Sequence, residues 1–257
     1  MGYILIENEK LEVPGVEIRH NLSFERHGGR FGIRGKLPRA RSLAVLHWGL
    51  GLNAIDLFEE FLRNEDPVNA VSSNFCVDND GTVYQWLNPY NQYGFHAGQP
   101  NNLYSFLSFH IVNLVHEMHN YRYENPRPVI DTYPHGKHKR ILGLYKEQIL
   151  SVLRILKVVS REFPRFKLKF PVRNFLPVET VIPDIISSGG VMSDLHLSNK
   201  KSDIAGLESQ IIALLISDQK LRDEFPDMEI NFCLRNQTMW KNWLLNIKKT
   251  WVWKEVF

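Results

Sequence analysis

The chain has few cysteines and no long apolar stretch. Its 257 residues include only two cysteines, Cys76 and Cys233, which lie far apart in the sequence. Because a disulfide framework needs more cysteines in a smaller chain, we expect both to be free thiols. No stretch approaches the roughly 18 apolar residues of a membrane span, and residues 1–10 lack the basic and apolar regions of a secretion signal. The sequence therefore predicts cytoplasmic synthesis, with any action on the cell wall following lysis or signal-free export.

An excess of one charge is also missing. Lys and Arg number 31 and Asp and Glu 28, so the net charge is +3. This value is too small to indicate a nucleic-acid or membrane partner by itself. The length and the hydrophobic content of 44% suffice for one sizeable core. We expect a wrapping segment at residues 1–40, one main domain at 41–216 and a Trp-rich helical extension at 217–257.

Strand and helix signals alternate through the middle of the chain. Short apolar runs bounded by glycine predict buried strands, and apolar residues at helical spacing predict helices with one buried face. The predicted elements are, in order, a strand at 42–48, a helix at 54–63, a hairpin at 72–77 and 82–87, a strand at 107–114 and a helix at 144–159. Within the hairpin, Asp80-Gly81 is expected to supply the positive-φ residues of a tight turn. This order predicts an α/β fold with a mixed central β-sheet flanked by helices.

The last third of the chain carries weaker signals. Residues 164–190 contain four prolines and a Ser-Gly cluster, which predicts a long ordered loop. Apolar residues then recur at helical spacing at Leu207, Ile211, Leu214 and Leu215. Near the C-terminus, Trp240, Trp243 and Trp251 also follow helical spacing. That spacing favours an amphipathic helix packed on the domain over a surface that stacks on carbohydrate.

His47 and the segment 194–203 contain the residue types of a metal site. His47 ends an apolar run, where a sheet would fix the backbone while the side chain reaches a cleft. A histidine in this position is commonly only a satisfied polar residue. Asp194-Leu195-His196, followed by Lys201 and Asp203, brings further imidazole and carboxylate groups close together. These groups are the raw material of a three-ligand zinc site with an open position for water.

The order of these motifs resembles the zinc-dependent N-acetylmuramoyl-L-alanine amidases, the family that includes phage lysozyme-like amidases and peptidoglycan-recognition proteins. The likeness runs from about Ser42 to Glu208. Its longest part, Ser73–Gln85, resembles the family's hairpin S-x-H-F-x-I-D-x-D-G-T-x-Y-Q. The shorter matches are Val45–Trp48, Phe95–Gly98, Asn101-Asn102, Ser108–Asn113 and Gly190–Asp203. The resemblance implies the amidase fold, with peptidoglycan or a muropeptide as ligand.

The resemblance also implies roles for individual residues. In such an enzyme two histidines and an aspartate or cysteine hold zinc, which activates water, and a glutamate carries the proton. Carried over, His47 is the first zinc ligand, Asp203 is the third, and Lys201 stabilises the developing oxyanion. The implied substrate-binding residues are His96, Asn101 and Asn102. His96 is interpreted as a hydrogen-bonded residue of the cleft wall, not as a ligand.

Two positions depart from the family's pattern. His110 stands where the family has its acid/base glutamate, and Asp194 stands where it has the second ligand histidine. Aspartate can bind zinc and histidine can transfer protons, so a site of His47, Asp194 and Asp203 with His110 as base is chemically allowed. Two carboxylates would raise the pKa of the zinc-bound water and weaken it as a nucleophile. His196 is the fallback ligand, on the same side as Asp194 if this segment is extended.

Three functions are compatible with these residues. The first, which we favour, is hydrolysis of the amide bond between N-acetylmuramic acid and L-alanine by a zinc-activated water. The second is a catalytically inactive pseudoenzyme that binds peptidoglycan or muropeptides in the same groove. The third is a nucleic-acid or protein-interaction module that uses the basic, Trp-rich C-terminus, for which DNA binding would fall steeply with salt. We expect no nucleic-acid partner, and the sequence specifies no oligomeric state.

Overall fold

A computed structural model describes the centre of the chain and several separate segments. The described residues are 2–20, 33–34, 42–49, 51, 53–63, 72–90, 92–94, 105–112, 129–131, 140–142, 144–170, 190–193, 211, 214–215 and 218–230. Among the helices in these ranges, none has the length and apolar character that crossing a membrane requires.

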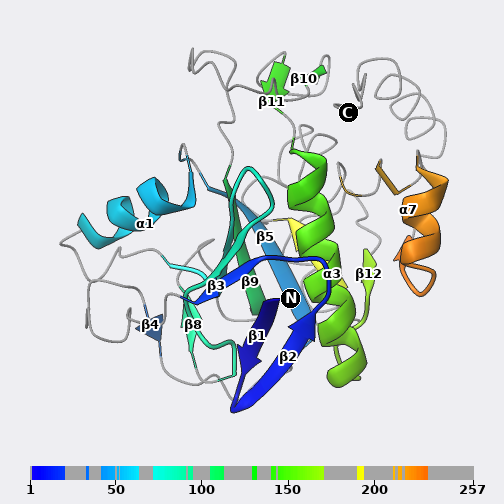
Figure 1. The fold of residues 1–257 in the computed structure, drawn as a ribbon, viewed down its shortest axis with the longest axis horizontal. Helices are drawn as coiled ribbons and strands as arrows, with labels where there is room; N and C mark the ends of the chain where they lie inside the picture. The colour runs from blue at the N-terminus through cyan, green and yellow to red at the C-terminus, as the bar shows by residue number, and fades with distance from the viewer. Residues whose placement is uncertain are drawn as a thin grey trace, which may run out of the picture.

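Short strands and three helices make up the described fold (Figure 1). The helices are α1 (Ala54–Arg63), α3 (Lys146–Glu162) and α7 (Gln219–Glu224). The strands are β1 (Gly2–Ile6), β2 (Glu9–Val13), β3 (Ile18–His20), β4 (Ile33–Arg34), β5 (Leu43–Gly49), β6 (Phe75–Val77), β7 (Val83–Gln85), β8 (Tyr93–Gly94), β9 (Ser105–Val112), β10 (Val129–Asp131), β11 (Arg140–Leu142), β12 (Lys169–Phe170), β13 (Gly190–Ser193) and β14 (Glu229–Ile230).

A six-stranded mixed sheet forms the centre of the protein. Its strand order is β13-β5-β9-β6-β7-β3. The first four strands run parallel to one another, β7 runs antiparallel to β6, and β3 runs parallel to β7. The predicted α/β fold with a mixed central sheet is therefore confirmed. The strands expected at 42–48 and 107–114 are β5 and β9, and the helix expected at 54–63 is α1.

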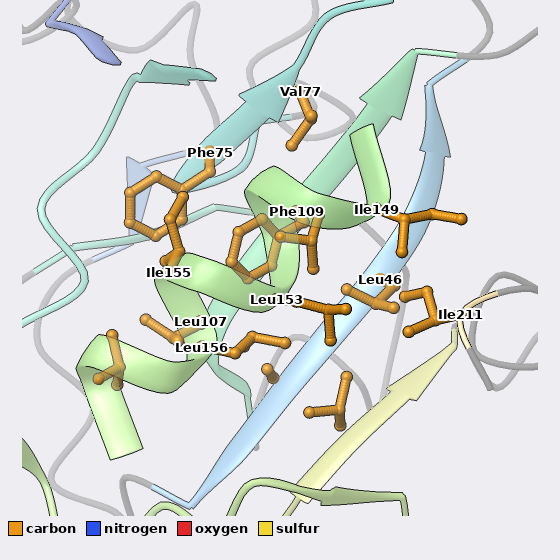
Figure 2. Close-up of a cluster of buried hydrophobic side chains, with 14 of the residues drawn as sticks. Leu46, Phe75, Val77, Leu107, Phe109, Ile149, Leu153, Ile155, Leu156 and Ile211 are labelled. Carbon is orange, nitrogen blue, oxygen red and sulfur yellow. The ribbon is translucent and has the colours of Figure 1, made fainter. Parts of the chain in front are cut away.

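Helix α3 covers one face of this sheet (Figure 1). Its apolar stripe, which includes Ile149, Leu153 and Leu156, packs on Leu46 of β5 and Phe109 of β9 (Figure 2). Each fully buried side chain of this kind contributes about 1.5–3 kcal/mol relative to an exposed one. The helix begins at Lys146 and ends at Glu162, whereas the sequence predicted residues 144–159. Its end falls close to Pro164, because the residue before a proline avoids helical backbone.

The opposite face of the sheet is covered in part by α1. Asn53 caps this helix, because its side-chain oxygen accepts the main-chain amide of Asp56 at 2.9 Å. Leu57 then lies so close to Gly49 that a Cβ on the glycine would come within 2.8 Å of the leucine side chain. A second cluster of buried apolar residues forms here from Ala54, Leu57, Cys76, Trp86, Leu87 and Val112. Successive side chains of β6 and β9 therefore alternate between two buried faces, one under α3 and one under α1. His110 lies on the α1 face.

The N-terminal hairpin of β1 and β2 is attached to the sheet through side-chain amides. Gln85 accepts the Leu5 amide at 2.7 Å and donates to the Leu5 carbonyl at 2.6 Å. Asn88 makes the same pair of bonds with Glu7, at 3.0 and 2.8 Å. Each amide thus replaces the ladder bonds that a neighbouring strand would supply. The hairpin also contributes Ile4 to the main core.

The hairpin of β6 and β7 confirms the prediction, but its turn is longer than expected. Gly81 has a φ of +85°, whereas Asp80 does not have a positive φ. The Gly81 main-chain amide donates to the Asp78 carbonyl at 3.0 Å, and the Asp78 main-chain amide donates to the Thr82 carbonyl at 2.9 Å. This pattern fits a three-residue loop, in which a β-turn from Asp78 to Gly81 ends on a left-handed glycine, in place of a two-residue loop.

The C-terminal part of the described chain differs from prediction at one point. Residues 169–170, expected in a loop, form β12, which pairs in parallel with β14. Ion pairs of Lys146 with Asp218 and of Arg154 with Glu224, both at 2.9 Å, join α3 to α7. Ile211, Leu214 and Leu215 are helical and buried, as expected. The predicted Trp-rich helix lies outside the described residues.

Replacing Gly81 by alanine is expected to destabilise the fold by about 1–3 kcal/mol, because the residue has a left-handed φ and its Cβ would meet the main-chain oxygen of Glu147 at 2.8 Å. Urea unfolding measures the change. Gly15→Ala is the matched control, since Gly15 has a φ of +73° but its Cβ would meet only the flexible end of Arg154. Equal losses in the two variants would contradict a contribution from the Glu147 contact.

Candidate functional site

His47 and His110 lie side by side on the α1 face of the sheet. The pairing of β5 with β9 places the two residues opposite each other. Their ring centroids are 4.9 Å apart and the rings meet edge to face at 79°. His110 is 2% exposed, whereas His47 is partly exposed. The pair therefore joins one imidazole that reaches solvent to one that is enclosed by protein.

A β-bulge brings the two histidines into register. Leu43 pairs with Ser105, but Ala44 pairs with Leu107, so Phe106 is an extra residue in β9. Without this shift, His47 would lie opposite Phe109. The bulge also lets consecutive residues Phe106 and Leu107 both enter the main core, which a regular strand does not allow.

Packing of Phe106 accounts for the bulge. Its ring lies edge to face against Phe163, with centroids 5.3 Å apart, directly after the end of α3. Phe106 is 5% exposed, so burial of the aromatic ring offsets the loss of regular pairing. The position of His110 therefore depends on a contact made at the other end of the strand.

Apolar and aromatic residues enclose His110 on the side away from His47. Cys76 pairs with His110 in the sheet, and the Trp86 ring centroid lies 6.5 Å from that of His110. Phe58 of α1 lies against Trp86, with centroids 6.1 Å apart. Charge–dipole interactions are stronger in such a water-poor environment than in solvent. The surroundings of His110 thus suit a group that transfers protons inside a closed site.

Cys76 is a free cysteine, as predicted, but not a reactive one. Burial, and to a smaller extent the charge of Asp78, raises the pKa of its thiol well above the ordinary value. The thiolate is the form that attacks substrates and binds metals. Cys76 therefore contributes packing beside His110, and its buried, protonated thiol is a poor nucleophile at neutral pH.

The same row of the sheet continues from Cys76 to Tyr84 and Arg19. These residues are paired across β6, β7 and β3. Arg19 donates to the Tyr84 hydroxyl at 3.1 Å and forms an ion pair with Glu17 at 2.7 Å. Burial raises the pKa of Tyr84, and the charge of Arg19 opposes this in part. This row of the sheet thus begins at the imidazoles of His47 and His110 and ends at the guanidinium of Arg19, which is ion-paired with Glu17.

A buried polar bridge below His110 escaped prediction. The Ser108 hydroxyl donates to Asn74 Oδ1 at 2.7 Å and accepts a hydrogen bond from the Asn74 main-chain N–H at 2.9 Å. The Ser108 amide donates to the same oxygen at 3.0 Å. These bonds join β9 to the residue directly before β6. Ser108 lies two residues before His110 in β9. The signal in the sequence was that Asn74 and Ser108 are polar residues beside or within apolar strand segments, where both are buried.

The geometry of the pair is compatible with a metal ion. Two imidazoles bound to one tetrahedral zinc have centroids about 5 Å apart, from Zn–N bonds of about 2.0–2.1 Å. The observed 4.9 Å between the His47 and His110 centroids is of this size. Within the described ranges, no cluster of three His, Cys, Asp or Glu residues could hold a metal. The described part of the chain thus brings together two of the expected site residues and holds no complete metal site.

The remaining predicted site residues lie outside the described residues. They are His96, Asn101, Asn102, Asp194, His196, Lys201 and Asp203. Strand β13 nevertheless ends at Ser193, which pairs with Leu46, the residue before His47. The last described residue of this segment thus lies next to the residue that precedes His47.

Cys76 is expected to resist alkylation in the native protein, because its side chain is fully buried and its thiol stays protonated. The measurement is iodoacetamide labelling of Cys233→Ser, in which Cys76 is the sole thiol. Labelling should be negligible in the native state and complete in denaturant. Fast labelling of the folded variant would show that Cys76 is accessible and would reopen a chemical role for it.

Comparisons with known proteins give one structural similarity. No family model matches the sequence, and no curated protein matches it. The chain is similar to the structure of the endolysin N-acetylmuramoyl-L-alanine amidase LysCS from Clostridium intestinale URNW, with a TM-score of 0.34 and 13% identity over 60% of this chain and 78% of that chain. A similarity of this size carries no inference about activity, and the α/β assignment rests on the six-stranded sheet itself.

Proposed function

We propose that the protein is a zinc-dependent amidase that hydrolyses the bond between N-acetylmuramic acid and L-alanine in peptidoglycan or muropeptides. The proposal is carried by the His47–His110 pair. Two motifs far apart in the sequence resemble the family's ligand strand and its acid/base strand. These motifs lie on neighbouring strands, with the two histidines opposite each other at 4.9 Å. A common site for the two motifs is what the proposal requires.

In this proposal His47 holds the zinc ion together with Asp194 and Asp203. When bound, the ion supplies a Lewis acid and lowers the pKa of water. The partial exposure of His47 supports this role, because substrate must approach the ligand side of the pair. The end of β13 beside Leu46 supports the inclusion of residues that follow Ser193.

His110 serves as the proton-transfer group in the proposed reaction. Water adds to the carbonyl carbon of the lactyl amide and gives a proton to the His110 imidazole. The C–N bond then breaks, and the imidazolium returns the proton to the leaving nitrogen of L-alanine. The products are the muramic acid carboxylate and a peptide with a free amino terminus. Lys201 stabilises the oxyanion between these steps.

Removal of either histidine is expected to separate the two roles. His47→Ala should lower the zinc content from about one per chain, as measured by elemental analysis. His110→Gln should retain zinc and lose about 10²- to 10⁴-fold in kcat, because glutamine cannot carry a proton. Release of peptide from a muramoyl-pentapeptide, followed by mass spectrometry, gives the rate.

His20→Gln is the matched control at neutral pH, since it removes an imidazole from the opposite face of the same sheet. It should leave zinc and kcat unchanged. Normal turnover by His110→Gln would exclude proton transfer by His110. A wild-type protein without zinc and without turnover that still binds muropeptide would instead be an inactive binder.

Asp194 and His196 are alternative ligands, and single substitutions distinguish them. If Asp194 binds zinc, Asp194→Ala should weaken zinc binding at least tenfold, while His196→Ala leaves it unchanged. Competition with a chromogenic chelator measures both affinities in the same buffer. The reverse pattern would assign the ligand role to His196.

A further inference from the structure

His20 lies between the edge of the central sheet and the N-terminal hairpin. Strand β3 is the edge strand, and His20 pairs there with Gln85 of β7. The His20 ring stacks on Tyr3 of β1, with centroids 4.4 Å apart and planes inclined by 28°. Both ring nitrogens are buried and neither makes a hydrogen bond of good geometry, although the Tyr3 main chain lies near the ring. The ring therefore fits this interface in its neutral form.

The stack lies among the polar contacts that attach the hairpin to the sheet. The Leu5 and Glu7 main chains bind the Gln85 and Asn88 amides, and the Gly2 amide donates to the Val16 carbonyl at 3.1 Å. The hairpin strands pair with each other and not with the six-stranded sheet. The junction is thus formed by side-chain contacts and by the burial of Ile4, Ile6 and Val13 in the main core, and not by a strand ladder.

A proton on His20 would be poorly accommodated. The imidazolium carries two N–H donors and a charge, and burying these without acceptors is costly. From the hairpin, Lys10 adds a second positive charge, with its ammonium 4.7 Å from the Tyr3 ring centroid. From β7 the facing residue is the uncharged Gln85. Arg19, the residue of β3 before His20, belongs to the other face, where it forms an ion pair with Glu17.

The pKa of His20 accordingly lies below its ordinary value. Burial is the main cause and the charge of Lys10 adds to it, while the nearby main chain of Tyr3 opposes it in part. Because the folded pKa is lower than the unfolded value of about 6.5, the neutral ring contributes stability that is complete above that pH. This contribution is lost as the pH falls through the folded pKa.

We propose that protonation of His20 loosens the β1–β2 hairpin from the central sheet, so that the N-terminal segment acts as an acid-sensitive clasp on β3 and β7. The proposal does not depend on the amidase activity. It assigns a pH response to a histidine outside the candidate site.

Hydrogen exchange of individual amides, followed by NMR and corrected for intrinsic rates, tests the proposal. The Leu5 and Glu7 amides report on the junction, because each donates to a side chain of the sheet. Between about pH 7.5 and about pH 5.5, these two amides should lose protection, while amides that bond within the β1–β2 ladder lose less. Equal protection at both pH values would refute the clasp.

The His20→Phe variant identifies the group responsible. Phenylalanine keeps the stack on Tyr3 but cannot bind a proton, so the pH response of the two junction amides should disappear. Lys10→Gln should shift the response to higher pH, because removal of a nearby cation makes protonation of His20 easier. The midpoint of the His20 ring titration should rise with it. An unchanged pH response in His20→Phe would overturn the proposal, and His47→Gln in a metal chelator is the control histidine variant that should retain it.

Discussion

The parallel pairing of β5 with β9 is the constraint on which both the core and the candidate site depend. On one face it brings Leu46 next to Phe109 beneath α3, and on the other it brings His47 next to His110. Because side chains alternate along each strand, a slip of one residue would exchange these faces. The burial of apolar residues under α3 thus holds two polar residues together on the opposite side. Core packing and site geometry are two consequences of one register.

The surroundings of the two histidines differ in a way that matters for chemistry. His47 remains partly exposed, whereas His110 is enclosed with Trp86 and the neutral thiol of Cys76. Two identical side chains therefore occupy a solvent-facing and an enclosed position a few ångströms apart. Environments that differ in this way suit a division of roles between binding and proton transfer.

Side-chain amides join elements of the fold that are not paired as neighbouring strands. Gln85 and Asn88 bind the N-terminal hairpin, and Gln148 of α3 donates to the Val112 carbonyl at 2.9 Å at the end of β9. Each satisfies main-chain groups without adding charge. The same hairpin encloses His20, whose nitrogens have no such partners. The contrast explains why the junction is stable with a neutral histidine and sensitive to a charged one.

Local patterns in the sequence determined the elements, and tertiary packing decided how they meet. The apolar run at 42–48, the helical spacing of α1 and the left-handed glycine at Gly81 depend on a few neighbouring residues and were predictable. Motif resemblance also paired His47 with His110 as members of one site. The bulge at Phe106 was not predictable, because it depends on contact with Phe163, far along the chain. The β12–β14 pair and the amide contacts of Gln85 likewise join residues distant in sequence. Periodicity specifies which face of a strand is buried, but only the packed structure selects the register that places one histidine opposite another.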